Sequence, residues 1–148
     1  LFSKFMKYIF SITFIILSFT FFCQCKGLSK KCIKTIGDGY MHTGQTSTSE
    51  LSSEKKFQFV AIFYEGQNYR ISSCSDTLLG DLQLTVRNLN RQLFYDNHGN
   101  GSTSYDFKVS NTQKLIISLI APKKESNNNL SSSENIIGCV TAIVGVRL

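Results

Sequence analysis

Hydrophobic and polar residues alternate in short runs along most of the chain, and turn-forming residues separate the runs. This period of two is typical of β-strands, and a spacing of about 8 to 12 residues between strands is typical of sandwiches and barrels. No amphipathic helix of ordinary length is expected beyond the N-terminal segment. The pattern predicts an all-β fold, an antiparallel, jelly-roll-like β-sandwich of about eight strands, at 31–36, 57–64, 69–74, 82–87, 92–95, 105–109, 114–121 and 136–147.

Several segments carry more specific expectations. The run 57–64 is apolar on both faces, which favours a central strand, whereas the polar stretch 37–56 is expected to be a loop. Residues 122–135 are rich in Ser, Asn and Lys and are expected to form an exposed, mobile loop. Gly138 and Gly145 in the last strand indicate bulges or close backbone approach.

The N-terminus differs from the rest of the chain. Lys4 and Lys7 precede a charge-free apolar stretch, which is typical of a secretory signal helix. We therefore expect a signal segment at 1–25 and a β-sandwich domain at 26–148. Cleavage before Lys26 is the preferred outcome, ahead of lipidation at one of the signal-end cysteines and of retention as an anchor.

The charge balance narrows the choice of partners. The 148 residues carry a formal net charge of +6, and removing 1–25 leaves 14 basic and 10 acidic residues. Much of the excess lies in a short basic tether that has no interleaved aromatic residues for stacking on bases. We therefore expect no nucleic-acid partner, and membrane contact only through the N-terminal segment. The tether lysines are Lys26, Lys30, Lys31 and Lys34.

Cysteine usage favours a disulfide. In an exported chain a bridge is the default, and no Cys-x-x-Cys motif indicates zinc in the domain. Both Cys74 and Cys139 lie in predicted strands, so they are the expected pair, with Cys32 spare. Pairing of Cys32 with either of the other two stays open.

The order of these elements resembles the bacterial pre-peptidase C-terminal domain, a jelly-roll β-sandwich found beside secreted peptidases. No peptidase domain accompanies the module here, so the resemblance implies an accessory role in trans. The matching segments are Tyr69-x-Ile71, Gly80-Asp81-Leu82-x-Leu84-x-Val86, Asp96-Asn97, Tyr105-x-Phe107-x-Val109 and Leu115-Ile116-Ile117-x-Leu119.

The chain is also similar to small secreted proteins of Gram-negative bacteria to which no activity is assigned. That similarity implies export to the periplasm or the outside of the cell, where lipidation at the signal end would make the chain a lipoprotein. It is carried by Cys32-Ile33-Lys34-Thr35, Gly39-Tyr40-x-His42-Thr43-Gly44-Gln45, Phe63-Tyr64-x-Gly66-Gln67-x-Tyr69-Arg70 and Gly138-Cys139-Val140.

The turn at 96–101 resembles a calcium loop in part. It lacks the acidic residue that an EF-hand requires at its twelfth position, where Phe107 stands. A looser calcium site through Asp96, Asn97 and Asp106 is the one cofactor hypothesis. The alternative is a tight hairpin turn.

The two histidines raise a catalytic alternative. His42 or His98 with Asp38, Asp96 or Asp106 and a serine would form a hydrolytic triad, but no Gly-x-Ser-x-Gly elbow is present. We therefore expect no catalytic residue and no enzyme.

Aromatic residues suggest a binding surface. Most alternate toward the predicted core, whereas Tyr40, Tyr64 and Tyr95 are candidates for a platform. Tyr40 and His42 join Asp96, Asn97 and Asp106 as candidate binding residues. The expected function is a non-catalytic, secreted or envelope-associated binding module for a protein or polymer, and the alternative is a small secreted hydrolase.

Overall fold

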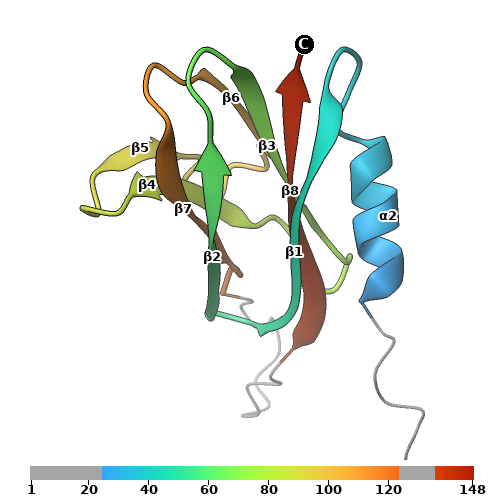
Figure 1. Ribbon diagram of the computed structural model, residues 1–148. Coiled ribbons are helices and arrows are strands. Elements are labelled where there is room, and N and C mark those ends of the chain that lie inside the picture. Colours follow the sequence, from blue (N-terminus) through green and yellow to red (C-terminus); the bar gives the residue numbers. More distant parts are fainter. Residues whose placement is uncertain (1–24, 124–135) are drawn as a thin grey trace, which may run out of the picture.

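The structure is a computed structural model that describes residues 25–123 and 136–148. Within these ranges one helix, α2 (Lys26–Lys34), precedes eight strands (Figure 1). The strands are β1 (Met41–Ser52), β2 (Lys56–Phe63), β3 (Asn68–Ser75), β4 (Gln83–Asn88), β5 (Leu93–Asp96), β6 (Ser104–Lys108), β7 (Gln113–Ile120) and β8 (Ile137–Arg147).

The strands form two antiparallel four-stranded sheets, ordered β1-β8-β3-β6 and β2-β7-β4-β5. This order is that of a jelly roll, so the predicted fold class is confirmed. The core between the sheets contains the alternate apolar residues of each strand, including Phe63, Ile71, Leu84 and Ile117. Val140 and Val144 of β8 are also fully buried there.

Two local predictions are wrong. The segment 31–36 belongs mostly to α2 instead of a strand, and the predicted loop 37–56 contains the 12-residue strand β1. In β1, half-buried Gln45, Ser47 and Ser49 alternate with exposed residues. Polar residues therefore occupy the inward-facing positions of this strand. Because the inward and outward positions are both polar, the alternation of a strand is not visible in the sequence.

The helix α2 covers the outer face of the sheet that contains β8 (Figure 1). Cys25, Leu28, Cys32 and Ile36 follow a spacing of three to four residues, which places them on one helical face. Cys32 and Ile36 pack there with Ile143 of β8. The lysines of the predicted tether therefore belong to a docked helix.

Disulfides fasten α2 at both ends, as Cys25–Cys139 and Cys32–Cys74. The predicted pair Cys74–Cys139 is wrong. Cys74 lies opposite Thr141 in the β3–β8 register, so Cys139 is its diagonal neighbour. Diagonal positions lie about 7 to 8 Å apart, beyond the usual span of a disulfide, whereas helix positions seven residues apart face the sheet together.

Cys25 is thus part of the folded domain, ahead of the predicted boundary at Lys26. Cleavage before Lys26 would remove one half of the Cys25–Cys139 bridge. Apart from Cys25, the predicted signal segment 1–25 lies outside the described residues, as does most of the predicted mobile loop 122–135. Within the described ranges, no helix is long and apolar enough to cross a membrane.

Bulges or close backbone approach were predicted at Gly138 and Gly145, and the structure instead shows side chains close to both glycines. A Cβ on Gly138 would meet the carboxylate of Asp76, and a Cβ on Gly145 would meet Ile36 and Tyr40. Gly145 therefore lets the segment after α2 lie directly on the sheet.

The strand β2 is an edge strand, whereas its two apolar faces predicted a central one. Its second face is open: Val60 is 53% exposed and Ile62 is 39% exposed. Burial within the described part of the chain does not account for these side chains, and this bears on function.

Candidate functional site

Two predicted site residues, Tyr40 and Asp106, meet on the outer face of the β1-β8-β3-β6 sheet. Asp106 of β6 accepts two hydrogen bonds from Arg70 of β3, each 2.6 Å, and one of 3.1 Å from the Tyr40 hydroxyl. Arg70 also donates to the carbonyl oxygen of Ile36 at 2.9 Å. The ring of Tyr40 lies 4.2 Å from the guanidinium carbon of Arg70 and 5.0 Å from that of Arg147.

The electrostatics of this cluster favour the ionised pair. The hydrogen bonds from Arg70 lower the pKa of Asp106, partial burial opposes them, and the Tyr40 hydroxyl adds to the lowering. The hydrogen bond to Asp106 raises the pKa of Arg70 in turn. Both carboxylate oxygens have partners, so the cluster fastens residues 36–40 to the sheet.

The turn residue Asn97 organises the chain around it. Asn97 is 2% exposed. Its Oδ1 accepts from the amides of Leu84 and Gly99, and its Nδ2 donates to the carbonyls of Leu82 and Ser102, at 2.6 to 3.1 Å. All four bonds go to backbone, so this side chain closes the turn.

Asp96 lies beside this turn. It accepts hydrogen bonds from Gln83 Nε2 and from the amide of His98. Burial would raise the pKa of Asp96, but these hydrogen bonds and the nearby charges of His98 and Arg87 outweigh it, so the pKa lies below its usual value.

The structure does not bring Asp96, Asn97 and Asp106 together. Tyr95 and Tyr105 stack between the sheets with ring centroids 4.2 Å apart. Because side chains alternate along a strand, Asp96 and Asp106 must point to opposite outer faces of the sandwich. No group of three or more His, Cys, Asp or Glu side chains is placed to hold a metal ion among residues 25–123 and 136–148.

The histidines lie in separate places. His42 Nε2 is 2.6 Å from the Thr46 hydroxyl across a bulge in β1. His98 is in the turn after β5, with Nδ1 3.7 Å from Asp96 Oδ2 and its side chain 81% exposed. Among the described residues, His42 therefore contacts a hydroxyl without a carboxylate, and His98 a carboxylate without a hydroxyl, so neither forms a triad.

The three candidate tyrosines do not form one platform. Tyr40 lies between two arginines over one sheet, and Tyr95 stacks on Tyr105 against the core. Tyr64 is 58% exposed and follows β2.

The outer face of the β2-β7-β4-β5 sheet was not singled out from the sequence, and it carries a hollow of about 250 Å³. The strand registers place residues in rows across β2, β7 and β4: Lys56–Ile120–Gln83, Gln58–Ser118–Thr85 and Val60–Ile116–Arg87. The middle row has the small hydroxyl residues of β7 and β4, between rows of longer side chains. This size difference produces the hollow.

Charged side chains surround this hollow. Lys56 of β2, Arg87 of β4 and Arg91 of the β4–β5 turn line it together with the hydroxyl residues. Thr85 is 2% and Ser118 is 5% exposed, so they form its floor. The signal available in sequence was the alternation Ile116-x-Ser118-x-Ile120 opposite Thr85, but recognising it requires the strand register.

A second cleft, of about 350 Å³, lies between α2 and strands β3 and β6. Its wall contains the Cys32–Cys74 bridge and several hydroxyl residues. Its one arginine, Arg70, is already bound to Asp106.

These features define a jelly-roll β-sandwich with one face covered by a disulfide-fastened helix and the other face free of any helix among the described residues. No family model matches the chain, and no curated protein matches it. Among solved structures it is similar to the crystal structure of Aeromonas hydrophila PliG, a periplasmic lysozyme inhibitor of g-type lysozyme. The TM-score is 0.48 at 9% identity, over 70% of this chain and 85% of that one. Similarity at this level supports no conclusion about function.

Proposed function

We propose that the protein is an exported, non-catalytic module that binds another protein through the outer face of the β2-β7-β4-β5 sheet. One observation carries this proposal. That face combines exposed apolar side chains on an edge strand with a cation-lined hollow, and no described helix covers it (Figure 1). An apolar patch beside charged residues is the usual composition of a protein interface.

The absence of a triad in the described residues supports a binding role over the hydrolase alternative. Each histidine has only one of the two partners that a hydrolytic relay needs. Two disulfides support export, because such bridges persist in oxidising compartments.

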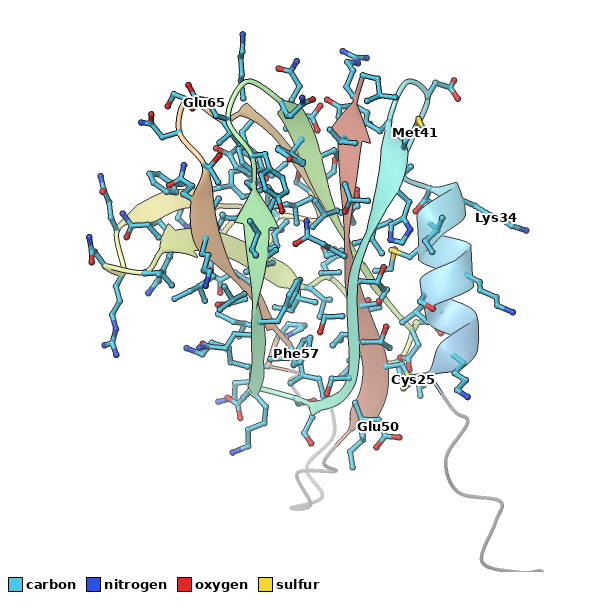
Figure 2. All side chains as sticks on the ribbon, viewed as in Figure 1. Cys25, Lys34, Met41, Glu50, Phe57 and Glu65 are labelled. Carbon is cyan, nitrogen blue, oxygen red and sulfur yellow. A yellow bond between two sulfur atoms is a disulfide. The ribbon has the colours of Figure 1, made fainter. Side chains whose placement is uncertain are left out.

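Site-directed photo-cross-linking tests the proposal. A photoreactive residue replaces Val60 on the proposed face, and the matched control carries it at Lys34, which is exposed at the end of α2 (Figure 2). In the exporting cells we expect one adduct of defined mass from position 60 and none from position 34. Excess unmodified protein should suppress this adduct, whereas excess Ile62→Asp protein should not.

Equal adducts from both positions, or suppression by Ile62→Asp as strong as by the unmodified protein, would contradict the proposed face. Circular dichroism of each variant checks that the sandwich is intact. Ile62 is exposed on an edge strand, so its replacement should leave the fold unchanged.

A further inference from the structure

We infer that the hollow between β2, β7 and β4 is a carboxylate-binding site that receives an acidic side chain of the partner. The inference rests on the proposed function and adds the chemistry of the contact. It starts from the floor, where Thr85 and Ser118 lie directly opposite each other in the β4–β7 register. Hydroxyl groups can donate hydrogen bonds to carboxylate oxygens. The volume of the hollow, about 250 Å³, is large enough for an aspartate or glutamate side chain.

The charge of the wall favours an anion. Lys56, Arg87 and Arg91 contribute three cations to the lining, which contains no carboxylate. None of the three is in an ion pair with another described residue. Arginine presents a planar fork of donors that matches a carboxylate in two-point contact, so two arginines on one wall are suited to this ligand.

Asp96 is a carboxylate beside this wall, since it lies opposite Thr85 in the β4–β5 register. Hydrogen bonds from Gln83 and from the His98 amide hold it. One fixed carboxylate beside three cations leaves the hollow with a net positive charge.

The backbone at Arg91 gives independent support. Its φ is +65°, in the left-handed region that favours glycine. The turn is closed by hydrogen bonds between Asn88 and Gln92, in which the Gln92 amide donates to Asn88 Oδ1 at 2.8 Å and Asn88 Nδ2 donates to Gln92 Oε1 at 3.1 Å. An arginine at this position costs conformational energy, and its guanidinium contributes to the hollow. A binding role accounts for that combination.

The neighbouring side chains favour a protein as the source of the carboxylate. Val60 is in the same row as Ile116 and Arg87, so exposed apolar surface continues directly from the hollow. A polyanionic glycan or polyphosphate has no apolar groups to bury against valine and isoleucine. An acidic residue flanked by apolar residues can contact both the cations of the hollow and the apolar side chains beside it. We therefore assign the site to a protein segment in which acidic and apolar side chains alternate.

Nuclear magnetic resonance titration of the exported protein tests this inference. The probe is an acetylated and amidated peptide of sequence Glu-Leu-Glu-Leu-Glu, and the control peptide has Gln in place of each Glu. We expect the acidic peptide to shift the amide signals of Thr85, Arg87 and Ser118, and to bind at least tenfold more weakly in 0.5 M salt. The Gln peptide should cause no saturable shift.

Variants make the test specific. Arg91→Gly should weaken binding of the acidic peptide about fivefold without lowering the thermal midpoint, because glycine accepts the positive φ. Arg87→Gln together with Arg91→Gly should weaken it by more than tenfold. Lys34→Gln removes one positive charge, as Arg91→Gly does, but Lys34 lies on α2. This control should therefore leave the affinity for the acidic peptide unchanged.

Equal binding of the two peptides would overturn the inference, as would unchanged affinity in Arg91→Gly. Tighter binding of polyphosphate or polygalacturonate than of the acidic peptide would assign the hollow to an anionic polymer instead. Each of these results leaves the cross-linking test at Val60 standing on its own, so failure of the carboxylate site and failure of the binding face are distinguishable.

Discussion

At the residue scale, neighbouring side chains leave no room for a Cβ at two glycines of β8, Gly138 and Gly145. A Cβ on Gly138 would lie 2.5 Å from Asp76 Oδ1 and 2.8 Å from Leu79 Cγ. Asp76 cannot easily move, because its carboxylate accepts the amides of Cys139 and Leu78 at 2.7 and 3.0 Å. Close approach, and not backbone conformation, therefore requires glycine at position 138.

We predict that Gly138→Ala lowers the free energy of unfolding by about 1 to 3 kcal/mol, the usual cost of inserting a methyl group into a packed site. Urea denaturation followed by circular dichroism measures it. Gly27→Ala in α2 is the matched control, since its Cβ would meet nothing within 4 Å. There we expect a gain of up to about 1 kcal/mol from helix propensity. A neutral Gly138→Ala would refute the close approach.

Asp106 is predicted to make the free energy of unfolding depend on pH in the acid range. Its pKa is lower in the folded chain, chiefly through the Arg70 hydrogen bonds. The stabilisation is therefore complete above the unfolded value of about 3.9 and is lost as the pH falls through the folded value. Because the carboxylate is 45% exposed, solvent screening limits the effect to under about 1 kcal/mol.

Urea midpoints between pH 2 and pH 6 measure this dependence. Asp106→Asn should show a smaller loss of stability on acidification than the unmodified protein. Tyr40→Phe, which removes one hydrogen bond to the carboxylate, should fall between them. Identical pH profiles in all three proteins would exclude a contribution from this cluster.

At the element scale, the helix α2 depends on its attachments. A helix of 9 residues is marginal in water, so packing on β8 and the two disulfides must hold it. The bridges close loops of 42 and 114 residues, and chain entropy assigns each about 4 to 5 kcal/mol.

Non-reducing peptide mapping should therefore recover Cys25 with Cys139 and Cys32 with Cys74. Replacing both residues of either pair with serine should lower the free energy of unfolding by about 2 to 5 kcal/mol. A peptide joining Cys74 to Cys139 would contradict the arrangement of α2 on the sheet.

The edge of β2 is closed by a side chain. Gln45 Nε2 donates to the Ile62 carbonyl at 3.0 Å, and Gln45 Oε1 accepts from the Ile62 amide at 2.9 Å. The side-chain amide thus satisfies both polar groups of one residue on the exposed edge, as a neighbouring strand would. The register shift in β1 between His42 and Thr46, together with Gly44 at φ +86°, directs Gln45 toward β2.

We predict that Gln45→Glu is more destabilising than Gln45→Ala, although glutamate is closer in shape. Glutamate retains an acceptor for the Ile62 amide but sets a negative charge against the Ile62 carbonyl. Thermal denaturation should show losses of about 1 kcal/mol for alanine and more for glutamate at pH 7. The reverse order would show that the bonds to Ile62 contribute little.

At the scale of the whole molecule, the Cys25–Cys139 bridge constrains processing. We predict that the exported protein retains Cys25, and that its intact mass places the N-terminus at or before this residue. Reduction should raise the mass by about 4 Da, two for each of two disulfides. An exported chain that begins at Lys26 would leave Cys139 unpaired and would contradict the bridge.

The two outer faces of the sandwich differ in structure and in proposed role. One is covered by α2 and carries the Arg70–Asp106–Tyr40 cluster, and the other has a hollow that no helix of the described segments covers. Asp106 and Tyr40 lie in the cluster on the covered face, whereas the proposed binding surface consists of residues that the sequence analysis did not select. Arg87 and Arg91 are neighbours in the sequence, whereas Lys56 lies on β2 and reaches the same hollow only through the pairing of β2 and β4 with β7.

The sequence by itself determined the fold class, because the strands predicted at 57–64, 69–74, 82–87 and 114–121 each contain a regular set of apolar residues that the structure buries. That alternation lies within a single strand, so it can be recognised in the sequence without knowing which strands pair. The tertiary structure alone decided which cysteines pair, which strand lies at an edge and which cations share a hollow. These depend on register and on contacts between residues far apart in sequence, and a shift of one residue along a strand would move every side chain to the other face.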